Sequence, residues 1–403
     1  MKKSIGCLLA IGVVASAYAQ ETSKSMSGIQ VSGFLRFRYE WLENPRAIPE
    51  NSLVNGTQYV TLPSTEGSDY VDAKSQTRTM LVLNLDKELK SGIRVHATLA
   101  GERLGGGSTR SYYEVKQAFA ARQFGSFEVG LGRFQPMIGL GTLGSAPDND
   151  GIMLAYKGEM LAVHSWVTKW GAQLDQSTAK TCVLSHATYA YADLEFRPIK
   201  PLKLVASYMA DISTDAKDSV YKSYAIGAEY IFAANNKPWL RISGEYAKNE
   251  AEKAKLMNAD VNSGATMATA HGASTPQAWF AAAKVLGANP NRPGSYGFGI
   301  QYRKADAAFD LVAMASPRAW EVPFNWTTPS WAGSATNHKG FELSVDVAPF
   351  EGAIFKAAYG FMKTTDPLAA KTLGSLGTVN SGVFTAAKAD SQNYFIAQMI
   401  VNF

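Results

Sequence analysis

The chain has 403 residues, a formal net charge of +5 at pH 7 and 46% hydrophobic residues. This small excess of positive charge gives no support to nucleic-acid binding. No stretch after residue 19 approaches the run of roughly 18 apolar residues that a membrane helix requires, which argues against a helical membrane protein. The 35 glycines, 18 tyrosines and 19 phenylalanines instead favour β-structure.

The start of the chain has the three parts of an export signal. Lys2-Lys3 supplies positive charge, an apolar region covers Ile5–Ala15, and Ala17–Ala19 is an A-x-A cleavage site. We therefore expect a signal peptide over residues 1–19 and a short periplasmic segment over residues 20–28. One of the two cysteines is removed with the signal, which excludes an intramolecular disulfide and a cysteine-based metal site.

The first expected strand covers Ile29–Trp41, where apolar and polar residues alternate as they do on the two faces of a β-strand. The polar set contains Arg36 and Arg38. An arginine at the middle of a bilayer costs roughly 2–4 kcal/mol, so we expect the apolar set to face lipid and the arginines to face inward. Tyr39 and Trp41 then fall where an interfacial aromatic girdle is expected.

Similar segments follow, joined alternately by short turns and by longer polar loops, as in an up-and-down barrel. The first long loop ends near Lys74. The sixteen expected strands cover residues 29–41, 77–86, 93–102, 111–124, 126–134, 151–157, 161–170, 185–197, 202–208, 221–232, 239–248, 294–304, 308–316, 338–347, 353–363 and 394–403.

The longest connection, Asn249–Pro293, has helix signals in place of strand alternation. Thr275 suits an N-cap, Pro276 suits the first turn, and Gly287 suits the end of a helix over Ala278–Leu286. We therefore expect a short helix within an external loop.

The last ten residues form the clearest strand after the first one. Every second residue counted back from Phe403 is apolar, and the other set carries Asn402, Gln398 and Tyr394. With no helical core to cover the apolar face, the pattern predicts that lipid covers it. The expected fold is all-β: a 16-stranded antiparallel up-and-down transmembrane β-barrel over residues 29–403. Its turns are short and periplasmic, its loops long and external, and both termini are periplasmic.

The stretch Gln117–Arg133 resembles the general (diffusion) porin family of Gram-negative outer membranes. In it one strand ends in a tight turn at Gly125 and the next finishes on Gly132-Arg133. Asp148–Tyr156 resembles the entry to the family's sixth strand, and Phe403 matches its terminal aromatic residue.

The resemblance implies a water-filled channel for passive diffusion of small hydrophilic solutes and ions. In that family the loop after the fifth strand folds into the barrel and narrows it, and acidic loop groups face arginines of the wall. The equivalent loop here is Gln135–Asp150, which lacks the family's Pro-Glu-Phe-Gly-Gly element. The expected pore-lining residues are Arg36, Arg38, Arg78, Arg94, Lys116, Arg133, Asp148 and Asp150. The other interpretation of each is a solvated wall residue away from the narrowest point.

Catalytic and metal-binding motifs are missing from the sequence. The five histidines show no HExxH spacing, and there is no Gly-x-Ser-x-Gly elbow. We therefore predict that the protein is not an enzyme and has no cofactor or metal. Three alternatives remain open: a substrate-specific channel with eighteen strands, a barrel enzyme such as an outer-membrane protease or phospholipase, and a secreted soluble β-protein such as a lectin or adhesin.

The resemblance also implies partners and a location. The protein would leave the cytoplasm by Sec-type export, lose its signal near Ala19 and enter the cell outer membrane. Its partners would be outer-membrane lipid and lipopolysaccharide, the barrel-assembly machinery, and further copies in a homotrimer. Phe403 would be the signal that the assembly machinery reads.

Overall fold

A computed structural model describes most of the chain after the expected signal. The described residues are 28–42, 52–55, 58–61, 75–105, 111–134, 138–140, 149–170, 188–213, 221–234, 237–252, 255, 275–306, 309, 338–363 and 393–403. The expected signal peptide and its cleavage site lie outside these ranges.

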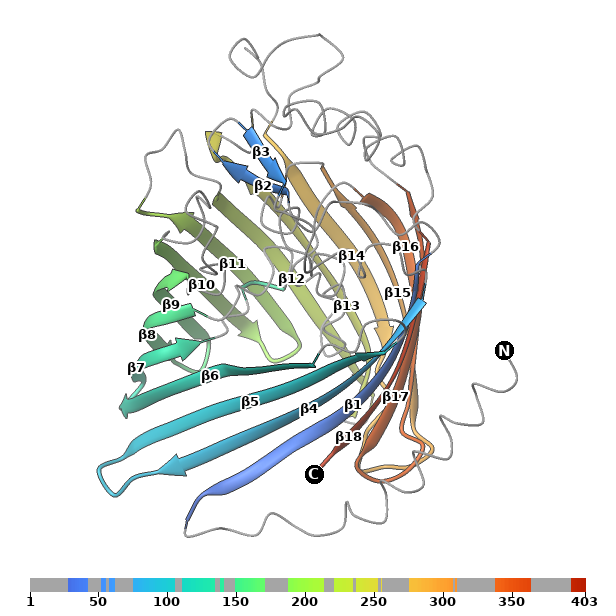
Figure 1. The fold of residues 1–403 in the computed structure, drawn as a ribbon, viewed down its shortest axis with the longest axis horizontal. Coiled ribbons are helices and arrows are strands. Elements are labelled where there is room, and N and C mark those ends of the chain that lie inside the picture. Colours follow the sequence, from blue (N-terminus) through green and yellow to red (C-terminus); the bar gives the residue numbers. More distant parts are fainter. Residues whose placement is uncertain are drawn as a thin grey trace.

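Sixteen antiparallel strands form one closed barrel, as the sequence predicts (Figure 1). The barrel strands are β1 (Gln30–Leu42), β4 (Ser75–Glu88), β5 (Ile93–Gly105), β6 (Ser111–Phe124), β7 (Phe127–Phe134), β8 (Asn149–Lys157), β9 (Leu161–Trp170), β10 (Thr188–Ile199), β11 (Leu202–Asp211), β12 (Lys222–Ala234), β13 (Lys237–Asn249), β14 (Gln277–Val285), β15 (Tyr296–Ala305), β16 (His338–Val347), β17 (Ala353–Lys363) and β18 (Tyr394–Asn402). A separate two-stranded sheet, β2 (Ser52–Asn55) with β3 (Gln58–Thr61), lies within the first long connection.

Each barrel strand pairs with its neighbour in the chain, and β1 pairs with β18 to close the ring. The chain end takes part in this closure. The backbone N–H of Gly33 donates to the carbonyl of Phe403 at 3.0 Å, and the N–H of Phe403 donates back to Gly33 at 3.1 Å. The terminal aromatic residue is therefore built into the seam of the barrel.

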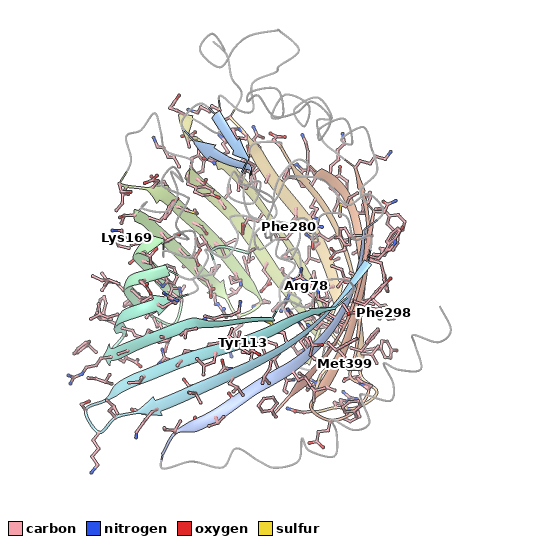
Figure 2. The ribbon with its side chains drawn as sticks, in the orientation of Figure 1. Arg78, Tyr113, Lys169, Phe280, Phe298 and Met399 are labelled. Carbon is pink, nitrogen blue, oxygen red and sulfur yellow. The ribbon has the colours of Figure 1, made fainter. Side chains whose placement is uncertain are left out.

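The register confirms the two faces expected for the first strand. Arg38 is opposite Arg78 of β4 and Gln398 of β18, so these polar side chains share the inner face. Phe37 is opposite Thr79 and Met399 on the outer face. Figure 2 shows Arg78 inside the ring of strands and Phe298 on its outer side.

Residues 277–285 form β14, so the helix expected over Ala278–Leu286 is wrong. Trp279 alternates with Phe280 between the outer and inner faces, and the strand pairs with both β13 and β15. Four alanines in this segment misled the prediction, because alanine has the highest helix propensity. Pairing on both sides overrides that local preference.

The strand expected over residues 308–316 lies outside the described residues except for Phe309. β15 pairs directly with β16, so the ring closes without it. The predicted count of sixteen strands is confirmed, but with β14 in place of this segment.

Aromatic side chains collect in two bands on the outer face. Near the long connections the ring centroids of Trp279 and Tyr302 are 5.2 Å apart, and those of Tyr302 and Phe341 are 4.7 Å apart. Near the short turns Tyr296 and Phe298 form a similar pair at 5.6 Å. Aromatic bands of this kind mark the two interfaces of a bilayer. Among the described residues, no helix is both long and apolar enough to cross a membrane.

The register makes a prediction at two neighbouring residues of β16. Leu343 lies on the outer face between the aromatic bands, opposite Ile300 and Tyr359, whereas Ser344 lies on the inner face. Leu343→Arg should destabilise the folded barrel in lipid vesicles by about 2–4 kcal/mol, because the charge faces hydrocarbon. Ser344→Arg, the control, should cost much less in the same urea titration. Equal losses would contradict the assigned faces.

Candidate functional site: the inner wall of the barrel

The inner wall carries a basic group on β1 and β4. Arg36, Arg38 and Arg78, hereafter the basic wall, share one face because Arg38 is opposite Arg78 and Arg36 is two residues away. Arg38 is 3% exposed and Arg78 is 1% exposed, so both guanidinium groups are enclosed within the barrel. Lys356 of β17 continues the group on the far side of Gln398. Basic side chains are therefore concentrated on this part of the wall.

Two carboxylates on the other side of the barrel bind a segment that belongs to the loop after β7. The backbone N–H of Gly139 donates to Asp193 Oδ1 of β10 at 2.9 Å, and the N–H of Leu140 donates to Glu245 Oε2 of β13. Ser207 also donates to Asp193 Oδ1, at 2.6 Å. Asp193 and Glu245, hereafter the acidic seat, therefore hold residues 138–140 against the inner wall.

Apolar packing completes this attachment. Leu140 is 2% exposed and packs in a buried cluster with Val205, Ala225, Ala247 and Phe280 of the inner wall. The residue two before it, Ile138, is fully buried. The described part of the loop after β7 thus lies inside the barrel, which is the position that the resemblance implied for Gln135–Asp150.

Gly139 is required at the centre of this attachment. Its φ of +64° lies in the left-handed region, which non-glycine residues rarely adopt. A Cβ added at Gly139 would come within 2.7 Å of Glu245 Oε2 and 2.9 Å of Ser207 Oγ. Any side chain there would displace the groups that bind the segment.

The basic wall and the acidic seat lie on opposite sides of the ring. Counting strands around the barrel, β11 is halfway round from β1, and β12 is halfway round from β4. The acidic seat stands on β10 and β13, which flank this pair. Basic side chains therefore lie on one side of the ring, and the two carboxylates that bind the loop lie on the other.

Charges near the short turns are paired in the described part of the wall. Glu128 of β7 accepts from Arg94 of β5 at 2.7 Å and from Lys157 of β8 at 2.5 Å. On the opposite wall, Lys284 of β14 lies 2.9 Å from Asp346 of β16. Arg94 thus faces inward as expected, in an ion pair that links β5 to β7.

Asp86 of β4 and His96 and Thr98 of β5 form a hydrogen-bonded series on the inner wall. The spacing of these residues in the sequence did not predict it. His96 Nδ1 is 2.8 Å from Asp86 Oδ1, and His96 Nε2 is 2.8 Å from Thr98 Oγ1. The Thr98 hydroxyl donates to Asn84 Oδ1 at 2.9 Å, so its proton points away from the imidazole. This is the geometry of a hydrogen-bonded wall and not of an activated nucleophile.

The structure corrects the expected inward placement of Arg133 and Asp150, which both lie on the outer face. Arg133 is opposite Ala118 and Asp150 on the outer face, because Phe134 and not Arg133 takes the inward position at the end of β7. Arg133 donates to both Asp150 oxygens, at 2.9 and 3.1 Å, and to the Val115 carbonyl at 3.3 Å. The Gly132-Arg133 resemblance identified the strand correctly but gave the wrong face.

Two further expected residues have other positions. Lys116 is the extra residue of a β-bulge in β6, where the ladder passes from Gln117 to Val115. Asp148 lies outside the described residues. In the structure the acids that bind the loop are Asp193 of β10 and Glu245 of β13, neither of which is among the expected pore-lining residues.

A closed ring of sixteen antiparallel strands with an apolar outer face, a charged inner face and part of one loop bound inside defines the porin architecture. No family model matches the chain, and no curated protein matches it in sequence. In structure it is similar to a quintuple mutant of Rh. blastica porin, with a TM-score of 0.51 and 10% identity. The match covers 93% of this chain and 100% of that chain. A triple mutant of Rhodopseudomonas blastica porin matches with a TM-score of 0.50, the same identity and the same coverage. These likenesses establish the fold.

The acidic seat makes Gly139 more sensitive to substitution than a glycine in an open turn. Gly125, the control, has a similar φ of +61°, but no atom lies within 4 Å of an added Cβ. Both alanine variants carry the same backbone strain, and Gly139→Ala additionally disrupts charge-assisted hydrogen bonds. We expect Gly139→Ala to lose roughly 1.5–3 kcal/mol more stability than Gly125→Ala in equilibrium unfolding in detergent. Equal losses would show that the seat contributes nothing.

Proposed function

We propose that the protein is an outer-membrane porin, a water-filled channel through which small hydrophilic solutes and ions diffuse passively. The observation that carries the proposal is the separation of faces in a closed ring. Apolar and aromatic residues cover the outside, while arginines, lysines and carboxylates line the inside. Charged residues gain from an inward position only if the lumen offers them water or ionic partners.

The loop Gln135–Asp150 narrows this channel in our proposal. Its residues 138–140 are bound to the inner wall through Asp193 and Glu245, which supports an inward course for the loop. Solutes would then pass between this loop and the part of the wall that carries Arg36, which is the least buried member of the basic wall. Arg94 would line the path nearer the short turns.

The basic wall gives the channel a mild preference for anions. Arg36 stands on the inner face of β1 and is only partly buried, so its guanidinium group lies beside the lumen. A cation beside the path raises the local concentration of anions. Small anionic and neutral solutes are therefore the expected cargo.

Replacing Arg36 tests both conduction and selectivity. In planar bilayers the unaltered protein should show discrete ionic conductance, and its absence from pure folded protein would overturn the porin proposal. Arg36→Gln should raise the cation-to-anion permeability ratio by roughly fivefold, because one charge beside the path is worth about 1 kcal/mol. The reversal potential in a KCl gradient measures this ratio.

The outward position of Arg133 provides a matched control. Arg133→Gln removes the same charge from the outer face and should leave the reversal potential unchanged. Equal shifts in the two variants would contradict the assignment of Arg36 to the ion path.

Location follows from the proposed function. The signal over residues 1–19 would direct Sec-type export, with cleavage after Ala19, and the barrel would then enter the outer membrane. Phe403 supports recognition by the barrel-assembly machinery, since its backbone closes the seam against Gly33. Outer-membrane lipid and lipopolysaccharide would surround the outer face.

A homotrimer is the proposed oligomer, with contacts on the outer face of β4–β6. β4 and β5 contain no Phe, Tyr or Trp, so the aromatic band near the long connections is interrupted on these two strands. Tyr113 of β6 projects from this region and is 85% exposed, with Gly101 beside its ring. A mainly aliphatic surface beside one large, exposed aromatic side chain suits packing against another protein.

Charge at Tyr113 should break the trimer. Tyr113→Lys is expected to convert the heat-sensitive oligomer in unboiled SDS gels to monomer, because the ammonium group would be buried between copies. Phe341→Lys, on an aromatic side chain that is 49% exposed elsewhere on the outer face, is the control and should remain trimeric. Monomer from both variants, or trimer from both, would argue against this interface.

A further inference from the structure

The closing strand β18 is joined to β17 without a tight turn. β17 ends at Lys363 and β18 begins at Tyr394, so the connection between them is long. Short hairpin loops fix the register of the strands that they join, whereas a long connection leaves several registers open. The pairing of β17 with β18 therefore needs another determinant.

The hydrophobic pattern of β18 does not supply this determinant. The inner face carries Ile396 and Ile400 beside Gln398. The outer face carries Phe395 and Met399. Side chains alternate with a period of two, so a shift of two residues keeps every side chain on its own face. The polarity of the two faces does not oppose such a shift, and only a specific contact distinguishes the native register from it.

One such contact joins Tyr394 to Gly360 of β17, which lies directly opposite. A Cβ added at Gly360 would come within 3.0 Å of three atoms of the Tyr394 ring. The ring therefore occupies the space of the side chain that Gly360 lacks, and it lies across β17 on the inner face. Gly360 is not one of the glycines with a positive φ, so the close approach of the ring, and not the backbone conformation, requires glycine here.

The hydroxyl group of Tyr394 extends the contact over two more strands. It donates a hydrogen bond to Glu342 Oε2 of β16 and accepts one from Arg303 Nη2 of β15 at 2.5 Å. Arg303 Nη2 is also 3.7 Å from Glu342 Oε2. All three side chains are buried. The first residue of β18 thus contacts β17, β16 and β15, which follow one another in the ring (Figure 1).

A shift of two residues would break every part of this contact. Tyr394 would then be opposite Met362 or Ala358, and both positions carry a side chain where the ring needs space. The hydroxyl group would move about 6.5–7 Å along the strand, away from Glu342 and Arg303. A buried charged group that loses a hydrogen-bonding partner is destabilising. The native register is therefore the one that accommodates the ring, the hydroxyl group and both charged groups together.

We propose that Tyr394 and Gly360 form a register lock, which sets the pairing of β18 with β17 and, through β18, the closure of the barrel. β1 pairs with β18, and the two backbone hydrogen bonds between Phe403 and Gly33 require β18 in its native position. A shifted β18 would present a displaced edge to β1 and leave backbone groups unpaired at the ends of the seam. The register lock concerns how the ring closes and goes beyond the proposed channel function.

Disulfide cross-linking of the full-length protein reads the register directly. In a Cys182→Ser background, Ala357→Cys with Ala397→Cys reports the native register, because these residues are directly opposite on the outer face. Tyr359→Cys or Phe355→Cys with Ala397→Cys reports a shift of two residues in one direction or the other. Residues diagonal to each other are too far apart to form a disulfide without such a shift. Each protein is refolded into lipid vesicles and oxidised, and the disulfide-linked peptides are quantified by mass spectrometry.

The native cross-link should dominate when Tyr394 and Gly360 are unaltered. Gly360→Ala should lower the ratio of native to shifted cross-link by at least about tenfold, because the added methyl group displaces the ring from a buried charge-assisted network. Tyr394→Phe keeps the ring over Gly360 but loses the hydroxyl group, so it should lower the ratio by a smaller factor. This second variant decides the question if Gly360→Ala yields no folded barrel.

Two controls separate a register lock from a general loss of packing. Gly101→Ala places a methyl group 3.3 Å from the ring of Tyr113 on the outer face and should leave the ratio unchanged. In a Tyr394→Ala background, Gly360→Ala should have no further effect, because no ring is left to displace.

Three results would each overturn the proposal: an unchanged ratio in Gly360→Ala or Tyr394→Phe, an equal fall in Gly101→Ala, or a further fall when Gly360→Ala is added to Tyr394→Ala. The cross-linking ratio does not depend on conductance. A failed porin assignment would therefore be distinguished from a failed register lock.

Discussion

Closure of the strand ladder is the constraint on which the rest of this structure depends. An open sheet edge in hydrocarbon would leave backbone N–H and C=O groups without partners, at a cost of several kcal/mol each. Here β1 and β18 meet, and the last residue, Phe403, exchanges two backbone hydrogen bonds with Gly33. The ring therefore has no edge. Once it is closed, every side chain must face either the outside or the lumen.

That division explains why the lumen is built from so many charges. Side chains alternate between the two faces along each strand except at bulges such as Lys116, so an apolar residue that faces lipid places its neighbour inside. Phe37 faces outward, for example, so its neighbours Arg36 and Arg38 face inward. Charges on the inner face need hydrogen-bonding partners or water. Other parts of the wall supply such partners. Glu128 joins Arg94 to Lys157, and Asp193 with Glu245 holds the backbone of residues 138–140.

Alternation made the fold and much of the inner wall predictable from sequence, because it is a local property. Strand count, closure and the faces of Arg36, Arg38, Arg78 and Arg94 agree with it. The failures have a different origin. Alanine-rich β14 has little β propensity of its own and is a strand because β13 and β15 pair with it. The inward position at the end of β7 belongs to Phe134, the residue after Arg133. A resemblance between short segments does not fix the register to one residue, and a shift of one residue reverses the face.

The acidic seat shows what local pattern could not reveal. Glu245 and Leu140 are separated by 105 residues, and their hydrogen bond exists only because the barrel brings β13 to the path of the loop after β7. No spacing in the sequence encodes that contact. The sequence does contain its one strict requirement, a glycine at 139 between two residues that are almost fully buried. A short Ile-Gly-Leu segment inside a Gly-rich loop is apolar enough to seek the wall, and the glycine lets its backbone approach two carboxylates. Backbone N–H groups and the buried side chain of Leu140 together hold residues 138–140 against the inner wall.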